Sequence, residues 1–335
     1  MALSLVAAAC GGEAATESAA DGAVAETTTT TVAPASSTTT TEAPATTTTS
    51  STTTTEAPAT TTTSTTTTAA PEAAFTFTDT VVLIDAGAEP RTELRFDLTD
   101  GLETLNSRQT QSITQSVGDE VINPGPLQVI DSVTTLNVMR DGDVFVIDSV
   151  IDSIAAVEGT DPTVIDAVNQ ALSASVGTAT SAVINDRGLL GESSFDPSND
   201  ELLDDLLAAQ GEVANPLPLE AVGVGAIWEN TQTIGIFGID VEQTTRTTLT
   251  AIDANIITLD VTVTQTVPEG STIDAQGQQL EVLAWESTSI GESQIDLTKV
   301  APIRTTSQTT SDQTLGTNGI EIDQLIEIGI ELTAG

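Results

Sequence analysis

Strict alternation of apolar and polar residues is the feature that most limits how this chain can fold. It occurs in the segments 94–98, 257–264 and 326–332, where β-branched residues are common. A period of two with β-branched enrichment predicts strands that bury one face. We therefore expect a mainly β (α+β) fold, built on a large curved antiparallel sheet or half-barrel.

Turn signals separate these segments and support hairpins. Asp141-Gly142 lies between two alternating runs and suits a two-residue type I′ turn. Proline, glycine and asparagine mark further turns at 123–126 and 185–188. Consecutive strands are therefore expected to pair in antiparallel fashion.

Two segments in the middle of the chain have the pattern of helices. The first spans about 161–175, with Asp161 able to cap it and Pro162 at its first position. The second spans about 199–210 and follows the capping-box sequence Ser198-Asn199-Asp200-Glu201. We expect these two inserted helices to cover one face of the sheet.

The N-terminal part of the chain has a different composition. Between Thr27 and Thr68, 25 of 42 residues are threonine, and the 14 residues 37–50 recur unchanged as 51–64. A segment with so little to bury cannot repay the entropy of ordering, so 11–74 is predicted to be a disordered Thr/Ala/Pro-rich linker. The composition suits an O-glycosylated stalk as well as an unmodified spacer. The domain prediction is therefore 1–10, 11–74 and a single β-rich domain at 75–335.

Residues 3–12 carry a resemblance to a bacterial lipobox. An apolar run ends in small residues before Cys10 and is followed by Gly11-Gly12. The resemblance implies that a diacylglycerol thioether forms on Cys10 after cleavage. Two departures are Ala7, where the family more often has leucine, and the lack of Lys or Arg before Cys10. They suggest a true start upstream or a fragment; the alternative is an apolar terminus with an incidental cysteine.

This interpretation gives the expected location. Cys10 would attach the chain to the cell membrane through lipid, because no later segment has about 20 consecutive uncharged apolar residues. The protein is then extracytoplasmic, with its folded domain in the cell wall or at the surface.

Composition excludes several classes of function. The chain has 335 residues, a net charge of −41, no histidine and one cysteine. These values exclude catalysis and metal sites that need histidine, and sites that need several cysteines. Only 8 Lys and Arg against 49 Asp and Glu also argue against a nucleic-acid partner. No catalytic, cofactor-binding or metal residue is assigned, and no cofactor is expected.

The combination of lipobox cysteine, Thr-rich stalk and acidic β domain resembles the uncharacterised lipoproteins of actinobacteria. The segment 216–229, PLPLEAVGVGAIWE, looks like one that recurs in a family of them, where a Pro-rich entry and a Val-Gly-x-Gly turn lead into a Trp-bearing strand. The expected sheet and helices are also similar to the half-barrel of LolA- and LprG-type lipid carriers. That second similarity is at the level of fold and implies a lipid or other apolar ligand.

Four groups of residues were weighed as sites. The pairs Trp228-Glu229 and Trp285-Glu286 could give two carboxylates beside sugar-stacking rings, as in a glycosidase. Neighbours on a strand face opposite ways, however, so two buried tryptophans with solvated glutamates is the structural alternative. Oxygen ligands for a calcium ion are offered by Asp196, Asn199, Asp200, Glu201, Asp204 and Asp205. The turn Gly223-Val224-Gly225 lacks the third glycine of a phosphate loop. The last candidate is the single lysine, Lys299.

The sequence therefore leads to a non-enzymatic, lipid-anchored envelope protein whose β half-barrel binds an apolar or lipid ligand. A stalked surface interaction or structural module is the first alternative. A carboxylate-dependent glycoside hydrolase is the second.

Overall fold

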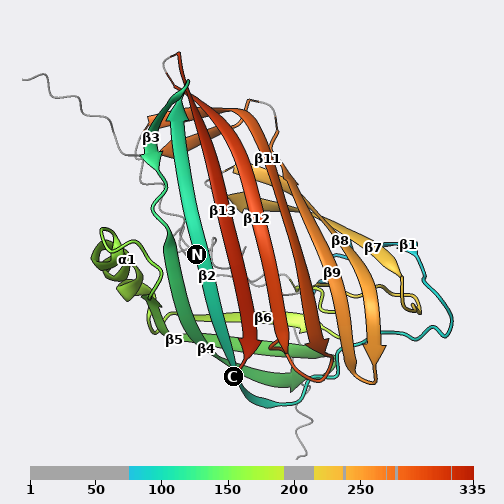
Figure 1. Cartoon of the computed structure of the whole chain (residues 1–335). Coiled ribbons are helices and arrows are strands. Elements are labelled where there is room, and N and C mark those ends of the chain that lie inside the picture. The colour runs from blue at the N-terminus through green and yellow to red at the C-terminus, as the bar shows by residue number, and fades with distance from the viewer. Residues whose placement is uncertain (1–74, 192–214, 237–238, 269, 276–277, 318) are drawn as a thin grey trace, which may run out of the picture. The chain divides into compact units, whose positions relative to one another are not determined.

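The described part of the chain is dominated by one sheet. The computed structural model describes residues 75–191, 215–236, 239–268, 270–275, 278–317 and 319–335. Within these ranges, thirteen strands join in one antiparallel open sheet (Figure 1). This confirms the mainly β fold. The strands are β1 (Val81–Asp85), β2 (Gly101–Val117), β3 (Glu120–Pro124), β4 (Gln128–Asp141), β5 (Val144–Ala156), β6 (Ala179–Asn185), β7 (Ile227–Ile236), β8 (Ile239–Asp253), β9 (Ile256–Thr266), β10 (Thr272–Ala275), β11 (Gln278–Asp296), β12 (Arg304–Thr317) and β13 (Ile320–Ala334).

The strand order places the last strand beside the second one. It runs β1-β7-β8-β9-β11-β12-β13-β2-β4-β5-β6, with β10 on β11 and β3 on β2. The last strand, β13, thus pairs with β2 along 12 residues, from Asp323↔Ser116 to Ala334↔Leu105. In Figure 1 the strands β9, β11, β12 and β13 rise steeply while β4, β5 and β6 cross near their lower ends, so the sheet is curved.

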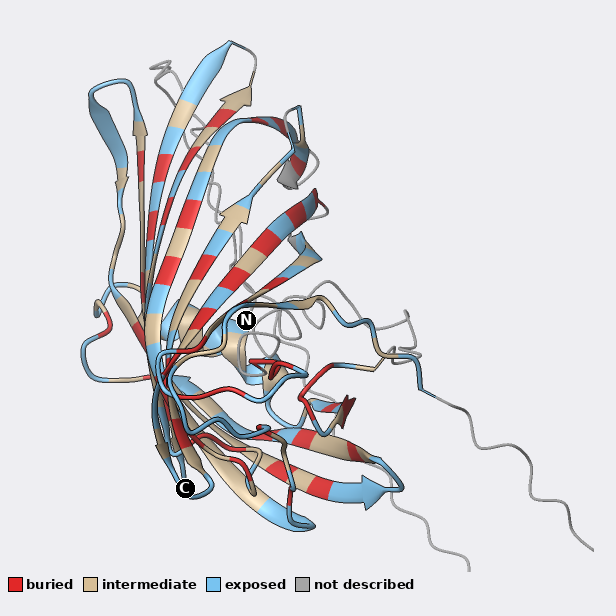
Figure 2. Cartoon of the chain, turned by 90° about the vertical axis from the view of Figure 1, so that its right-hand side faces the viewer, coloured by how far each residue is buried: buried red, intermediate tan, exposed pale blue. Residues whose placement is uncertain are grey.

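Register divides the side chains between two faces, because directly paired residues point to the same side. We call the face that carries Trp228, Val263 and Ile326 the inner face, and the opposite one the outer face. Irregular segments lie on the inner side, between the two parts of the curved sheet (Figure 2).

The alternation at 94–98 predicts the buried residues correctly, but the segment does not form a strand. Leu94 and Leu98 are buried, yet residues 93–99 are extended chain that crosses the inner face. The N–H groups of Phe96 and Asp97 donate to carbonyls of Asp186 (2.7 Å) and Leu297 (2.9 Å), which belong to separate parts of the fold. The backbone is therefore satisfied without a ladder, and the apolar side chains fill the space between the two parts of the sheet.

Two buried clusters hold this crossing segment. Leu94 packs with Leu217, Trp228 and Leu259 in the larger cluster, and Leu98 packs with Phe145 in the smaller one. Phe96 is half-buried against both. The segment therefore joins β7–β11 to β4–β6 through apolar contacts.

The first predicted helix is present but shorter and capped differently. α1 spans Ile165–Leu172 and continues as the 3₁₀ turn η1 (Ser173–Ser175). Asp161 does not cap it, because its carboxylate accepts the N–H (2.8 Å) and hydroxyl (2.6 Å) of Thr163 in a local turn. None of its residues is buried, and it packs on β5 through Asn169, which accepts the N–H of Ala156 (2.7 Å). α1 therefore lies on the sheet at β5 with residues that are half-buried or exposed.

The second predicted helix, 199–210, lies outside the described residues. So do the leader and linker segments 1–10 and 11–74.

The predicted hairpin at 141–142 forms with a shifted turn. Asp141 pairs with Val144, so the two loop residues are Gly142 and Asp143. Gly142 has φ of 61°, whereas Asp143 is not among the described residues with positive φ. A single positive φ at the first loop position is the pattern of a type II′ turn, not type I′. The turn at 185–188 forms as predicted, with Gly188 donating to the carbonyl of Asn185 (3.0 Å).

Candidate functional site

The inner face is uncharged along the central strands. At the described positions of β7, β8, β9, β11, β12 and β13, and of β2 beyond Glu103, every inner residue is aliphatic, aromatic, glycine, hydroxyl or amide. Its polar members are mostly buried or half-buried. They include Ser107, Gln109, Gln111, Gln115, Asn230, Gln232, Gln243, Thr245, Thr247, Gln265, Ser287, Ser289, Ser293, Ser307, Ser311, Gln313 and Gln324.

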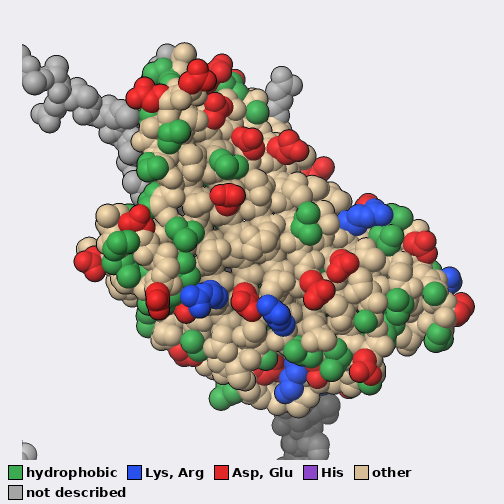
Figure 3. Space-filling view, viewed as in Figure 1, with side chains coloured by type: hydrophobic (Ala, Val, Ile, Leu, Met, Phe, Trp, Pro, Cys, Tyr) green, Lys and Arg blue, Asp and Glu red, His purple; other side chains and the backbone are tan. Residues whose placement is uncertain are grey.

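The outer face carries the charge instead. On β13, Glu321, Asp323, Glu327 and Glu331 all point outward, in alternation with the inner isoleucines. Acidic side chains are spread over this face in Figure 3, and Lys and Arg gather in its lower half. A chain with 49 acids thus keeps them away from the inner side of its central strands.

A row of small and aliphatic residues crosses the middle of the inner face. Register links Val261 to Gly291, Gly291 to Ser307, and Ser307 to Ile330. All four are half-buried. Gly291 and Ser307 are short beside their neighbours, so β11 and β12 form the low part of the face between the aliphatic side chains of β9 and β13.

A pocket of about 420 Å³ opens at the edge of β7, where residues from both faces of that strand line it. That volume falls in the range of small-molecule sites, which is about 300–1,000 Å³. Its wall has hydroxyl, amide and aliphatic groups and no charged side chain among the described lining residues. They are Thr78, Thr80, Gly188, Leu189, Leu190, Pro216, Asn230, Thr231, Gln232 and Thr233.

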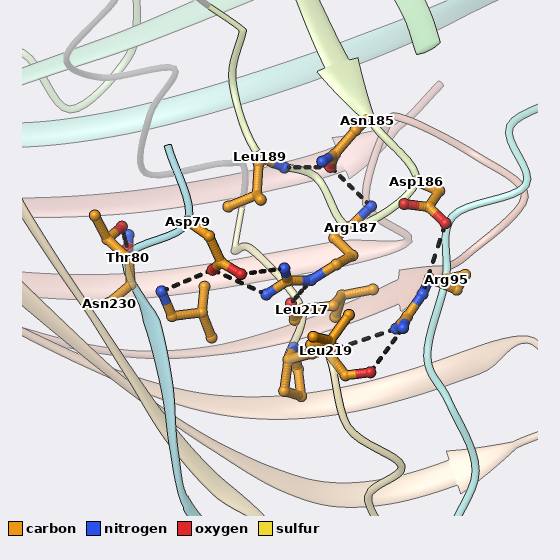
Figure 4. A network of polar contacts seen from close by, with 12 residues as sticks. Asp79, Thr80, Arg95, Asn185, Asp186, Arg187, Leu189, Leu217, Leu219 and Asn230 are labelled. Carbon is orange, nitrogen blue, oxygen red and sulfur yellow. Dashed lines mark hydrogen bonds and ion pairs between the residues drawn. The ribbon is translucent and has the colours of Figure 1, made fainter. Parts of the chain in front are cut away.

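An ion pair fixes two walls of the pocket (Figure 4). The Arg187 side chain is only 8% exposed; its Nη1 and Nη2 donate to Asp79 (2.5 and 3.1 Å) and its Nε to the carbonyl of Leu217 (2.8 Å). Asp79 lies between the lining residues Thr78 and Thr80, and Arg187 precedes Gly188. Three chain segments are therefore held in place by one guanidinium group.

This contact shifts the titration of Asp79. The hydrogen bonds from Arg187 hold the pKa of the Asp79 carboxyl below its usual value. Burial acts in the opposite direction, and the N–H of Val81 (3.1 Å) and the charge of Arg187 add to the lowering. Asp79 thus stays ionised while Arg187 is held in the wall.

Further hydrogen bonds and an ion pair hold the turn at 185–188. The side chain of Asn185 accepts N–H groups of Arg187 (2.9 Å) and Leu189 (3.0 Å), which fixes the turn at 185–188. Arg95 pairs with Asp186 (3.6 Å) and donates to the carbonyl of Leu219 (2.7 Å). Thr80 donates to Asn230 of β7, so the remaining wall is also held by a side-chain hydrogen bond.

The two Trp-Glu pairs do not converge. Glu229 and Glu286 both face outward, away from their tryptophans, and Glu229 pairs with Arg246. Register places Glu229 level with Ile290 of β11, three strands away and four residues from Glu286. At about 4.8 Å per strand and 3.4 Å per residue, the two carboxylates lie roughly 20 Å apart. Glycosidase pairs lie within about 10 Å, so this pair does not form such a site.

The tryptophans themselves differ. Trp228 is 1% exposed in the larger apolar cluster, and its indole N–H donates to the carbonyl of Pro216 (3.0 Å). Trp285 is half-buried on the inner face beside Leu280 and Val282, and its buried indole N–H has no hydrogen-bond partner in the described part of the chain.

The remaining candidates have structural roles or lie outside the described residues. Lys299 is exposed, 3.8 Å from Glu103. Gly223 packs against the chain at 86–88, where a Cβ would lie 1.8 Å from the carbonyl oxygen of Ala88. Cys10 and the calcium candidates at 196–205 are not described.

Across 75–191 and the described stretches that follow, no group of three or more Asp, Glu, His or Cys could hold a metal ion. Of the helices found there, none is both long enough and apolar enough to cross a membrane.

Comparisons with known proteins add little. No family model and no curated protein matches the chain. Among solved structures, an outer membrane channel from Pseudomonas putida F1 is similar over 72% of this chain and 97% of that one, with 8% identity and a TM-score of 0.24. A likeness this low carries no argument about fold or function.

The sequence did not single out the uncharged inner face or Arg187. The uncharged inner face had a signal, because the acids of β13 occupy alternate positions opposite to those of Gln324 and the isoleucines. Arg187 had no signal in the sequence, because its contact with Asp79 joins residues 108 positions apart.

Proposed function

We propose that the inner face and its pocket bind an uncharged, lipid-like ligand, and that the protein acts as a non-enzymatic carrier. The observation that supports this most is the distribution of charge: acidic residues crowd the outer face, and none occupies the described central inner face. Burying a charge without a partner costs several kcal/mol, so such a face selects against ionised ligands. Its aliphatic side chains suit a hydrocarbon chain.

The half-buried row described above is the place to test the proposal. Ser307→Glu puts a carboxylate on the inner face of β12, while Gln308→Glu puts the same group on the outer face one residue away. We expect the first to weaken binding of 1-monolauroylglycerol at least tenfold and the second to change it less than twofold. Titration calorimetry with the full-length protein measures both.

Ser307→Gln separates charge from size, because it adds a longer side chain without a charge. We expect it to weaken binding less than Ser307→Glu does. Equal affinity in Ser307→Glu and Gln308→Glu, with both proteins folded, would contradict the inner face as the binding site. Native mass spectrometry of protein purified from its own cells would then identify the resident ligand.

The location is a separate part of the proposal. A diacylglycerol group on Cys10 would anchor the chain to the cell membrane and place the β-rich domain in the envelope. The lipobox resemblance supports this. Labelling with radioactive palmitate behind a complete lipoprotein signal should mark the protein, and Cys10→Ser should abolish the label. A label that persists in Cys10→Ser would refute the anchor.

One observation favours the alternative of a surface interaction module. Val82 and Ile84 of the edge strand β1 are 59% and 52% exposed, and register places Val82 on the outer face beside Glu229. An exposed apolar edge strand is a common docking place for a protein partner. Val82→Glu with Ile84→Glu should leave ligand binding intact, whereas loss of a partner in a cross-linking experiment would favour the module.

A further inference from the structure

Two unpartnered polar atoms lie in one row of the inner face. Register connects Trp285 of β11 to Gln313 of β12 and Gln313 to Gln324 of β13. Gln324 is only 1% exposed. Its Oε1 and the Nε1 of Trp285 are both buried, and neither has a hydrogen-bond partner within the described ranges.

Such atoms are unusual in a folded protein. Buried polar side-chain atoms nearly always have a hydrogen-bond partner, because leaving one unsatisfied destabilises the fold. Other inner-face glutamines follow that rule: Gln265 donates to Gln243 (2.9 Å), and Gln313 donates to Ser311 (3.0 Å). Among uncharged side chains of the described ranges, the exceptions are Trp285 and Gln324, which flank Gln313. Two further buried oxygens without a hydrogen bond, on Glu103 and Asp131, belong to ion pairs with Lys299 (3.8 Å) and Arg108 (3.7 Å).

The two atoms need opposite partners. The indole N–H of Trp285 is a donor, and the amide oxygen of Gln324 is an acceptor. The two residues lie two strands apart, about 10 Å between backbones, and both side chains project from the same face. A hydroxyl group can accept from one and donate to the other, and a carboxylate cannot donate to Gln324.

We propose that Trp285 and Gln324 form a subsite for the hydroxyl-bearing, uncharged head of the bound ligand, such as a glycerol or sugar head. This rests on the proposed carrier function and adds the chemistry of the ligand's polar end. The hydrocarbon part then lies along the aliphatic side chains of β9 and β13, and the head meets the amides at this row. The charge-free surroundings exclude an ionised head.

Three probes with the same chain length test the subsite in the full-length protein: 1-monolauroylglycerol, methyl laurate and laurate. We expect the glycerol ester to bind about tenfold more tightly than the methyl ester, since one or two hydrogen bonds of about 1 kcal/mol each give that ratio. Laurate should bind least.

Two variants locate the effect. Gln324→Leu keeps the approximate size and removes the amide, so it should lower affinity for the glycerol ester to that for the methyl ester and leave the methyl ester unchanged. Trp285→Phe removes the indole N–H and should lower the preference several-fold. Gln308→Leu is the control, because it removes an amide from the outer face of β12; the preference should persist in it.

The outcomes separate the two proposals. If none of the three probes binds the wild-type protein, the carrier function fails and the subsite with it. If the glycerol and methyl esters bind equally, or Gln324→Leu and Trp285→Phe keep the preference, ordered water alone satisfies these atoms and the subsite is overturned while the carrier function stands. If Gln324→Leu does not fold, the result for Trp285→Phe decides whether the subsite exists, because Trp285 is only half-buried.

Discussion

The two tryptophans are each followed by a glutamate and lie on the same face of the sheet, but their surroundings differ. Trp228 fills the apolar cluster under the crossing segment, with its N–H bonded to a carbonyl. Trp285 lies near the glutamines of the central strands, with its N–H unpartnered in the described structure. The half of the inner face at Trp228 is thus closed by the chain itself, whereas the half at Trp285 has polar atoms left to bind something else.

This difference shows that a buried aromatic residue has two distinct uses in one sheet. One ring holds separate segments together, and the other offers a hydrogen-bond donor beside aliphatic side chains. The following experiments test how far the two halves differ, beginning with the largest expected effect.

Trp228→Ala should lower the free energy of unfolding by about 3–5 kcal/mol, because it leaves a large cavity and an unpaired carbonyl at Pro216. Trp285→Ala should cost at least 1 kcal/mol less, since that ring is half-buried. Denaturation with urea measures both. Equal losses would mean that the two halves are packed alike.

Asp79→Asn should lower the free energy of unfolding by about 1–3 kcal/mol. The change leaves the buried Arg187 guanidinium without its counter-charge, although Asp79 itself is partly exposed, which reduces the effect. Glu229→Gln, which breaks the exposed pair with Arg246, is the control and should cost under about 1 kcal/mol. A larger loss in Glu229→Gln would place the important ion pair outside the pocket wall.

The Asp79 contribution should also depend on pH. The pKa of Asp79 is lowered in the folded protein, so its stabilisation is fully present above the unfolded value of about 3.9. It is lost as pH falls through the lower folded pKa. The stability difference between wild type and Asp79→Asn, followed by urea denaturation from pH 7 to pH 2, should shrink only below about pH 4; a constant difference would argue against the ion pair.

Ala254→Gly should give the smallest effect, a gain of about 0.5–1 kcal/mol. Ala254 has φ of 54° in the turn between β8 and β9, a conformation that glycine adopts without strain. Ala251→Gly, inside β8, should cost a similar amount instead. Thermal unfolding measures both, and a loss in Ala254→Gly would mean that this end of the packed half tolerates a strained turn without cost.

The sequence predicted the sheet well because alternation reports directly on which face a strand buries. Strands β9 and β13 follow their predicted pattern residue by residue. The prediction of a strand at 94–98 was wrong, because extended chain that crosses a sheet buries alternate residues just as a strand does. Only long-range partners, here Asp186 and Leu297, distinguish the two cases.

The candidate site was less accessible to prediction. The outward direction of Glu229 and Glu286 followed from strand geometry alone, and the structure confirms it. The pairing of Asp79 with Arg187 joins segments 108 residues apart, and no local pattern encodes it. The row from Trp285 to Gln324 lies on the consecutive strands β11, β12 and β13, but its exact register is not encoded by alternation alone.

The way the chain enters the fold determines how it would respond to a pulling force. Residues before Phe75 connect to the sheet through the bridge of Phe77 to Gly191, then the Asp79–Arg187 pair, and only then β1, which pairs with β7 at four positions. Tension applied along the N-terminal segment therefore reaches the walls of the pocket before any long strand. The mechanical strength of the attachment is set by that ion pair and a short edge strand, and the twelve-residue pairing of β13 with β2 is spared.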